Sequence, residues 1–303
     1  MTSPIRIGTR KSPLALWQAQ QVQDHFSALG ITSVLVTITS EGDANQTTPL
    51  YAMGITGVFT KSLDLALLEN RIDIAVHSMK DVPTTLGEGL VQAAVLERGS
   101  VHDLFIRASN SPIGDNSTIA TGSMRRAAQW KSRFPNHHMV DLRGNIQTRL
   151  DRLNSFGIDG IIMAAAGIER LGINPSYSET LDWMVPAPAQ GAVMVVCREK
   201  SQHIIELCQS FNHIPTAICT AIERSFLKTL EGGCTAPIGA LATIENTKIN
   251  FQGVLSSVDG KHKITVDESC NGDRTDNFGE RCAESVLKKG GKELMAAIKT
   301  QMS

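Results

Sequence analysis

Three side chains that can do acid–base or anion-binding chemistry follow one predicted strand. The stretch VHSMKDVP places Ser78, Lys80 and Asp81 at the end of this strand, and open α/β sheets hold ligands at the carboxyl ends of strands. Asp81 is a candidate acid or base, or a group that stabilises a cation. Lys80 is a candidate for a Schiff base or for binding an anion, although a surface pair between Lys80 and Asp81 explains the residues equally well. His77, within the strand, is interpreted as a hydrogen-bonded core histidine.

A thiol in a different setting lies in the stretch LEGGCTAPIG, where Cys234 follows two glycines in a predicted loop. Small neighbours let bulky groups approach its sulfur, which could therefore pack, bind a metal, attack a substrate or carry a group covalently. A nucleophilic thiol needs a nearby base or helix N-terminus, and neither is visible locally. From the residues alone, a packed thiol is the leading interpretation of Cys234.

Arginines stand at predicted strand-to-helix turns. Ser123 is a predicted N-cap, which places Arg125 and Arg126 in the first helical turn, where the helix dipole disfavours cations. Arginines at positions that cost stability indicate an anionic ligand, which the free N–H groups of the helix would also favour. The same reasoning applies to Arg10, just before the helix predicted to be capped by Ser12.

Further arginines extend this pattern in the middle of the chain. Arg143 stands beside Gly144, Arg149 follows six residues later, and Arg170 is the last basic residue of this cluster in the second lobe. Each of them alone is more simply explained as coating a solvated face. Several at turns fit a larger ligand with many carboxylates, because an arginine fork binds a carboxylate bidentately.

The composition excludes several classes of protein. The 303 residues are 42% hydrophobic and 19% charged with a net charge of −1, so no global charge points to nucleic acid or to an anionic membrane. No run reaches the ~18 apolar residues of a membrane helix, and the first residues contain no apolar signal core. We therefore expect a cytoplasmic protein without nucleic-acid or membrane partners.

The six cysteines do not form a metal-binding pattern. No CxxC pair occurs, and no cysteine and histidine cluster has zinc spacing. Without an export signal, a disulfide scaffold is not expected in a chain of this length. We expect reduced thiols, most of them in the core, and no metal.

Strand and helix signals alternate along most of the chain. IRIGT and the helix starting at Pro13 are followed by SVLVTIT, predicted to be a buried strand, and by a helix with Thr60 as its cap. A second unit repeats this order, and GAVMVVCRE is predicted to return to the first lobe. From about Thr216 a helix, the Cys234 loop, three strands and a closing helix follow. The predicted fold class is α/β, with a first lobe of residues 1–98 and 193–215, a second of residues 99–192, and an α+β C-terminal domain of residues 216–303.

Eight motifs together resemble one enzyme family. They are RIGTRKSPLALWQA, GVFTKSLDLALL, DIAVHSMKDVP, TGSMRR, LRGNIQTRL, AAAGIERLG, PAQGAV and LEGGCTAPIGA. In order and approximate spacing they are similar to porphobilinogen deaminases, also called hydroxymethylbilane synthases, over nearly the whole chain. The resemblance implies two lobes like those of periplasmic binding proteins, a third domain with the cofactor cysteine, and a monomeric transferase of tetrapyrrole and haem biosynthesis.

The resemblance also implies roles for individual residues. Cys234 would hold a dipyrromethane cofactor through a thioether, and Asp81 would be the catalytic acid in the stepwise addition of four porphobilinogens with loss of ammonia. Hydrolysis would then free the linear tetrapyrrole. The residues implied to bind the cofactor are Cys234, Asp81, Lys80, Ser78, Ser123, Arg125, Arg126 and Arg143. The residues implied to bind substrate or the moving chain are Arg10, Ser12, Phe59, Arg149, Arg170 and Gln190.

The sequence departs from the family pattern at three positions, and two other functions fit part of it. Thr56 and Ala52 stand where relatives often have lysine, which leaves a lysine contact from that loop to the substrate open. Gly122 stands where a second serine is common and removes one hydroxyl from the anion site. The rivals are a two-lobed receptor for an organic polyanion, which would not use Cys234, and an enzyme with pyridoxal phosphate on Lys80.

Overall fold

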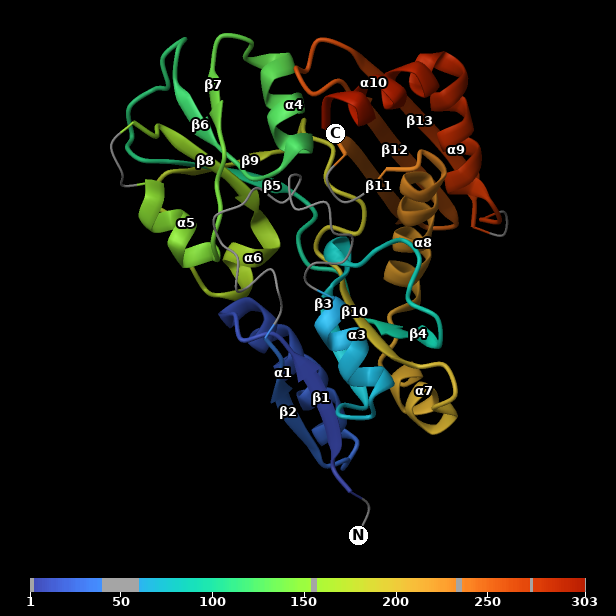
Figure 1. Ribbon diagram of the computed structural model, residues 1–303. Coiled ribbons are helices and arrows are strands. Elements are labelled where there is room, and N and C mark those ends of the chain that lie inside the picture. The colour runs from blue at the N-terminus through green and yellow to red at the C-terminus, as the bar shows by residue number, and fades with distance from the viewer. Residues whose placement is uncertain (1–2, 40–59, 154–156, 233–235, 273–274, 303) are drawn as a thin grey trace. The chain divides into compact units, whose positions relative to one another are not determined.

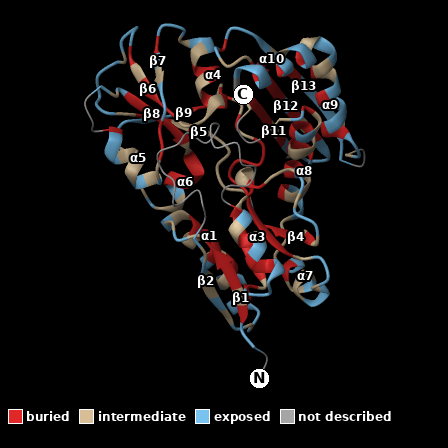
Figure 2. Cartoon of the chain, in the orientation of Figure 1, coloured by how far each residue is buried: buried red, intermediate tan, exposed pale blue. Residues whose placement is uncertain are grey.

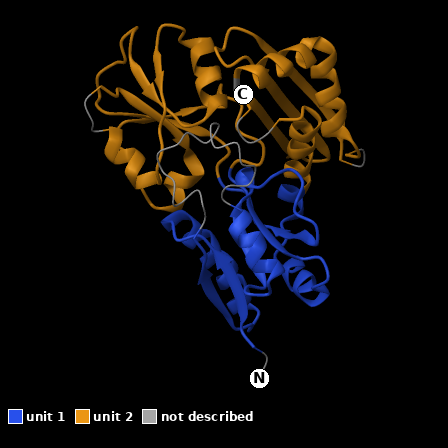
Figure 3. Ribbon diagram, viewed as in Figure 1, with its two compact units in different colours: residues 1–46, 55–99, 191–217 blue, residues 47–54, 100–190, 218–303 orange. Residues whose placement is uncertain are grey.

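The computed structural model describes residues 3–39, 60–153, 157–232, 236–272 and 275–302. These residues form two compact units (Figure 3). Unit 1 comprises residues 3–39, 60–99 and 191–217, and unit 2 comprises the rest. Along the described residues, the chain leaves unit 1 after Gly99, returns to it at Gly191 and leaves it again within the helix α8 (Ile214–Thr229).

Unit 1 is built on a five-stranded sheet in the order β2-β1-β3-β10-β4 (Figure 1). β1 runs parallel to β2 and β3, whereas β10 is antiparallel to β3 and β4. Its strands are β1 (Ile5–Thr9), β2 (Ser33–Thr37), β3 (Ile74–Ser78), β4 (Leu90–Val95) and β10 (Val193–Arg198). Its own helices are α1 (Pro13–Ala28), α3 (Lys61–Leu68) and α7 (Gln202–Gln209). The prediction that GAVMVVCRE returns to the first lobe is confirmed, because β10 lies between β3 and β4.

Burial follows the position of each strand in this sheet. β3 and β10 are central and almost wholly buried, as their apolar sequences predict (Figure 2). β2 was predicted to be buried, which is wrong: it is the edge strand, and Val34 is 39% exposed. β-branched residues suit any pleated surface, so their presence in SVLVT does not reveal whether a strand is central.

The α/β part of unit 2 repeats the order of the first sheet. Its strands are ordered β7-β6-β8-β5-β9, with β6 parallel to β7 and β8 and with β5 antiparallel to β8 and β9. The strands are β5 (Asp103–Arg107), β6 (Thr118–Ala120), β7 (His138–Val140), β8 (Gly160–Ala164) and β9 (Ser178–Leu181), and the helices are α4 (Met124–Arg133), α5 (Ile146–Leu153) and α6 (Ala165–Arg170). β5 here takes the place that β10 takes in unit 1. Alternate residues of β5 and β8 face two separate clusters of buried side chains, one on each face of the sheet.

The C-terminal part of unit 2 is a three-stranded antiparallel sheet covered by helices. β11 (Ile238–Glu245), β12 (Lys248–Ser256) and β13 (Lys263–Asn271) pair in chain order. α8 and α9 (Phe278–Val286) supply the apolar partners of this sheet, and the Phe226 and Phe251 rings lie 5.1 Å apart. The single closing helix of the prediction is divided into α9 and α10 (Lys292–Met302), because the backbone is non-helical at Lys289 and at Gly290, whose φ is +97°.

With three sheets and two lobes of matching strand order, the predicted fold class is confirmed. Within unit 2, Glu223 of α8 joins the C-terminal sheet to the α/β part. Its buried carboxylate accepts the N–H of Ala189 at 2.6 Å and the N–H of Ala242, in β11, at 2.8 Å. That residues 216–303 form a domain of their own remains a prediction.

Candidate active site

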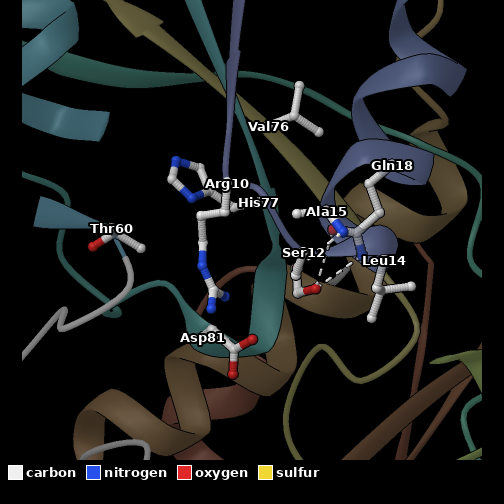
Figure 4. A pocket seen from close by; sticks show the side chains of 10 residues that line it. Arg10, Ser12, Leu14, Ala15, Gln18, Thr60, Val76, His77 and Asp81 are labelled. Atoms are coloured by element: carbon white, nitrogen blue, oxygen red, sulfur yellow. Dashed lines mark hydrogen bonds between the residues drawn. The ribbon is translucent and has the colours of Figure 1, made fainter. Parts of the chain in front are cut away.

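A pocket of about 90 Å³ lies in unit 1, where β1 and β3 end and α1 begins (Figure 4). It is lined by Arg10, Ser12, Leu14, Ala15, Gln18, Thr60, Val76, His77, Ser78 and Asp81. Because β1 and β3 are parallel neighbours, their carboxyl ends bring residues 10–12 and 77–81 together. Four residues singled out from the sequence, Arg10, Ser12, Ser78 and Asp81, therefore share one pocket.

The N-terminus of α1 gives this pocket an affinity for anions. Ser12 caps the helix as predicted, because its hydroxyl accepts the N–H of Ala15 at 3.3 Å, and Pro13 occupies the first helical position. The first turn of this 16-residue helix contains no acidic side chain. Arg10 adds a positive charge to the partial charge of the helix end.

Asp81 sits at the end of a short 3₁₀ turn, Met79–Asp81, that follows β3. Backbone bonds hold the turn: the Met79 N–H donates to Ala192 O at 3.0 Å, and the Val82 N–H donates to Met79 O at 3.1 Å. Figure 4 shows the Arg10 side chain extending toward the Asp81 carboxylate. Lys80, on the same turn, is half-buried and does not line the pocket.

His77 differs from the prediction of a hydrogen-bonded core histidine. It is buried, but its Nε2 has no hydrogen-bond partner among the described residues. Burial, with the nearby charge of Arg10, lowers the pKa of His77 to about 4. The imidazole is therefore neutral at physiological pH.

In unit 2 the two arginines of α4 surround a buried carboxylate that the sequence analysis missed. Arg125 Nη1 lies 2.7 Å from Asp103 Oδ2, and Arg126 Nε lies 2.8 Å from Asp103 Oδ1. Gln190 Nε2 also donates to Asp103 Oδ1, at 2.9 Å. Burial alone would raise the pKa of the Asp103 carboxyl, but the charges of Arg125 and Arg126 hold it well below its usual range.

This cluster changes the physical account of the arginines in α4. Asp103 is the anion that compensates them, so their unfavourable place in the first turn does not by itself require a ligand. Arg125 keeps spare donor capacity, because its buried Nε has no hydrogen-bond partner in the described part of the chain. Gln190 is wholly buried and also donates to Val101 O at 2.8 Å, so in this structure its amide supports the cluster.

The remaining arginines of unit 2 follow other elements of its sheet. Arg143 lies in the loop after β7, and burial lowers its pKa with only a partial offset from Asp141. Arg170 ends α6, and burial lowers its pKa against the charge of Glu169. Arg149, on α5, donates through Nε to Gly144 O at 2.9 Å. Burial thus disfavours the charged form of both Arg143 and Arg170.

Ser123 and Gly122 occupy the turn before α4. The Ser123 hydroxyl accepts the Arg126 N–H at 3.5 Å, so the predicted cap is confirmed. A Cβ at Gly122 would lie 2.5 Å from Leu142 O. The loop that carries Arg143 therefore approaches this turn more closely than a side chain at position 122 permits. Thr60 occupies the cap position of α3, but its side chain makes no capping hydrogen bond.

Several predicted residues lie outside the described ranges: Cys234, Phe59, Thr56 and Ala52. The five described cysteines are free thiols. Burial raises the pKa of Cys197 to about 11 and those of Cys208 and Cys282 to about 12, so these three are not thiolates at neutral pH. Over the described ranges, no group of three or more metal-ligating side chains occurs, and no helix is long and apolar enough to cross a bilayer.

Three buried polar residues that hold elements of the fold together were not predicted from the sequence: Gln18, Asp103 and Glu223. Each is a buried polar residue next to apolar residues of its own strand or helix. A buried polar side chain needs hydrogen-bond partners, so a polar residue in such a position is the signal that could have found them.

Two family models match the chain. One, described as porphobilinogen deaminase, dipyromethane cofactor binding domain, matches residues 5–206, and one described as the porphobilinogen deaminase C-terminal domain matches residues 217–288. The porphobilinogen deaminase of Moorella thermoacetica is 38% identical over 98% of this chain and 97% of its own length. That of Xanthomonas axonopodis pv. citri is 39% identical over 97% of this chain and 99% of its own length.

Solved structures of binding proteins give weaker likenesses. The methionine-binding protein MetQ aligns with a TM-score of 0.44 and 13% identity, over 68% of this chain and 89% of that one. A periplasmic substrate-binding protein of an ABC transporter from Coxiella burnetii aligns with a TM-score of 0.44 and 12% identity, over 73% of this chain and 96% of that one.

Replacing Asp103 tests the buried ion-pair cluster. In the Asp103→Asn variant, Arg125 and Arg126 lose the charge that compensates their burial, so the free energy of unfolding should fall by about 3–5 kcal/mol. Urea denaturation followed by circular dichroism measures the change. The matched control is Asp182→Asn, at an exposed position of unit 2. A loss no larger than that of the control would contradict the account.

The neutral state of His77 predicts a specific dependence of stability on pH. The folded-state pKa of about 4 lies below the unfolded value of 6.5, so as pH falls between them the unfolded state binds the proton first and stability is lost. Between pH 7.5 and 5 the wild type should lose about 2 kcal/mol more than His77→Gln.

Comparison with the variant is needed because Asp64 titrates in the same window with the opposite sign. Burial raises the pKa of Asp64 to about 6, so its contribution to stability grows as pH falls. Urea denaturation at both pH values measures the difference, with His203→Gln, an exposed histidine of unit 1, as control. Equal pH dependence in wild type and His77→Gln would show that His77 is not held neutral.

Proposed function

The chain belongs to the porphobilinogen deaminase family, and from that premise we propose that it condenses four porphobilinogen molecules stepwise and frees the linear tetrapyrrole hydroxymethylbilane by hydrolysis. It is an enzyme of tetrapyrrole synthesis, and the proposed reaction makes it a transferase. The observation that carries the proposal is the pocket of unit 1, where Asp81 faces Arg10 beside the N-terminus of α1.

Porphobilinogen carries groups of both signs that this pocket can bind. Its two carboxylates suit Arg10 and the capped start of α1 at Ser12, which offer a guanidinium and a helix N-terminus. Its pyrrole N–H and its aminomethyl group, a cation at neutral pH, suit the Asp81 carboxylate. A neutral His77 beside Arg10 adds no second positive charge to repel the ammonium group.

In the proposed mechanism Asp81 stabilises the positive charge that develops as ammonia leaves. The bond between the methylene carbon and nitrogen breaks, ammonia takes the electron pair, and the pyrrole is left electron-poor. A carboxylate held on an anchored turn lowers the barrier because it is already oriented toward that charge. The methylene carbon then bonds to the acceptor pyrrole, whose ring carbon loses a proton.

The residues of unit 2 fit a group with several carboxylates, and residues 5–206 match the dipyrromethane-binding domain of the family. The buried Nε of Arg125 offers a hydrogen bond that the described residues do not take up. Arg143 and Arg170 carry pKa values lowered by burial, which a bound carboxylate would restore. When bound, the cofactor would supply the pyrrole carbon that accepts the first unit, and each later unit would be added to the terminal ring of the growing chain.

We propose that the predicted residues divide between cofactor and substrate as the family resemblance implies. Cofactor carboxylates would be bound by Lys80, Ser78, Ser123, Arg125, Arg126 and Arg143. The incoming substrate and the growing chain would be bound by Arg10, Ser12, Phe59, Arg149, Arg170 and Gln190. Each added pyrrole brings two carboxylates, so arginines on several elements serve the lengthening chain better than one anion site would. We further propose a monomer that acts in the cytoplasm.

Intact mass of the purified protein tests the proposed thioether at Cys234. The wild type should exceed its polypeptide mass by one dipyrromethane and colour with Ehrlich's reagent, because a covalent group survives denaturation. Cys234→Ser should lack both signals, and Cys270→Ser, at another described and half-buried thiol, should keep both. Active protein with the bare polypeptide mass would refute the tether, and it would favour neither rival function.

Asp81→Asn tests the proposed catalytic acid. Loss of the preorganised charge should slow porphobilinogen consumption on the order of 10²–10³-fold, while circular dichroism stays that of the wild type. Asp24→Asn, at an exposed position of α1, should keep the wild-type rate. Turnover near the wild-type rate in Asp81→Asn would remove Asp81 from the mechanism.

A further inference from the structure

Gln18 is the polar exception on the buried face of α1. The other buried residues of this helix, Ala15, Ala19, Val22 and Phe26, are apolar and belong to the packing of unit 1. Gln18 is only 2% exposed, yet it lines the pocket that contains Asp81. A buried carboxamide without hydrogen-bond partners would lower the free energy of unfolding by about 1–3 kcal/mol. The partners of Gln18 therefore indicate its role.

The Gln18 side chain is bonded to Ser78, 60 residues away in the sequence. Gln18 Nε2 donates to Ser78 Oγ at 2.8 Å, and Ser78 Oγ donates to Gln18 Oε1 at 3.2 Å. The pair spans from the first turns of α1 to the last residue of β3. The Ser78 hydroxyl is therefore held from a helix, which is a more rigid support than a loop.

Ser78 is the residue from which the Asp81 turn departs. It occupies the cap position of the turn Met79–Asp81, yet its hydroxyl makes no capping bond there, because that hydroxyl is bonded to Gln18. The backbone of the turn is fixed on one side by the bond from Met79 N–H to Ala192 O. Gln18, on α1, holds Ser78 at the start of the turn. Asp81 lies three residues after Ser78, so a shift of Ser78 would also shift the Asp81 carboxylate.

We infer that Gln18 is a positioning residue for Asp81, acting through Ser78. The kinetic part of this inference rests on the proposed function, whereas the structural part does not. Gln18 has no charge and no predicted contact with the reacting atoms. Its effect should therefore fall on the rate of the chemical step, with little change in substrate affinity.

A double-mutant cycle tests the kinetic part. Gln18→Met removes the hydrogen bond at similar volume, and Ser78→Ala removes its partner. Each should lower kcat for porphobilinogen consumption about 10-fold or more with KM changed less than about 3-fold. The double variant should match Ser78→Ala, because both changes break the same link. Gln20→Met, at an exposed position of the same helix, should keep the wild-type kcat.

Two kinetic outcomes would overturn the inference. If the losses in kcat of the two single variants multiply in the double variant, Gln18 and Ser78 act independently. If Gln18→Met lowers the melting temperature but keeps the wild-type kcat, the residue serves packing alone.

Hydrogen–deuterium exchange without substrate tests the structural part. The amides of Met79 and Val82, which donate within and beside the turn, should exchange at least several-fold faster in Gln18→Met and at the wild-type rate in Gln20→Met. Unchanged exchange would overturn the inference even if kcat fell. A wild-type protein that does not consume porphobilinogen would refute the proposed function. In that case the exchange rates by themselves would still show whether Gln18 holds the Asp81 turn in place.

Discussion

The carboxylate of Asp103 is buried at the start of β5, and Arg125 and Arg126 close over it from the first turn of α4. Burying any of these charges alone would cost several kcal/mol, so they can be buried only together. The ion pairs consequently fix α4 against β5, and Gln190 adds a third bond to the same carboxylate. Asp103 therefore sets the position of the N-terminus of α4, which Ser123 caps, and of the Arg125 Nε, which has no hydrogen-bond partner among the described residues.

A second buried carboxylate extends this constraint through unit 2. The Glu223 carboxylate accepts the N–H of Ala189, the residue before Gln190. The φ of Ala189 is +60°, which is unusual for a residue other than glycine. The Glu223 carboxylate also accepts the N–H of Ala242 in β11. α8 and β11 flank residues 230–237 in the chain, so the two elements that lead into the LEGGCTAPIG stretch are tied to the loop that supports Asp103.

Local features of the fold could be predicted from the sequence, and long-range pairings could not. Ser12 and Pro13 announce the start of α1 because a cap and an N1 proline act within one turn. Asp103 pairs with Arg125 and Arg126, which lie 22 and 23 residues later in the sequence. No rule of sequence spacing predicts that a residue of a strand pairs with a helix so far along the chain. His77 was assigned correctly to the core, but its missing partner depends on which side chains surround it in space. The sequence predicted Asp81 at the carboxyl end of a strand, but not that it shares a pocket with Arg10, which follows from the parallel pairing of β1 and β3.

The strand order of unit 1 has a consequence for synthesis on the ribosome. β10 lies between β3 and β4 and bonds to both, yet it is translated about a hundred residues after β4, a delay of roughly 5–20 s at typical elongation rates. Until it emerges, the nascent chain exposes one edge of β3 and one of β4, both rich in apolar residues. The sheet that holds Asp81 is thus completed only after the α/β part of unit 2 has been translated, which leaves this segment dependent on protection from aggregation during its own translation.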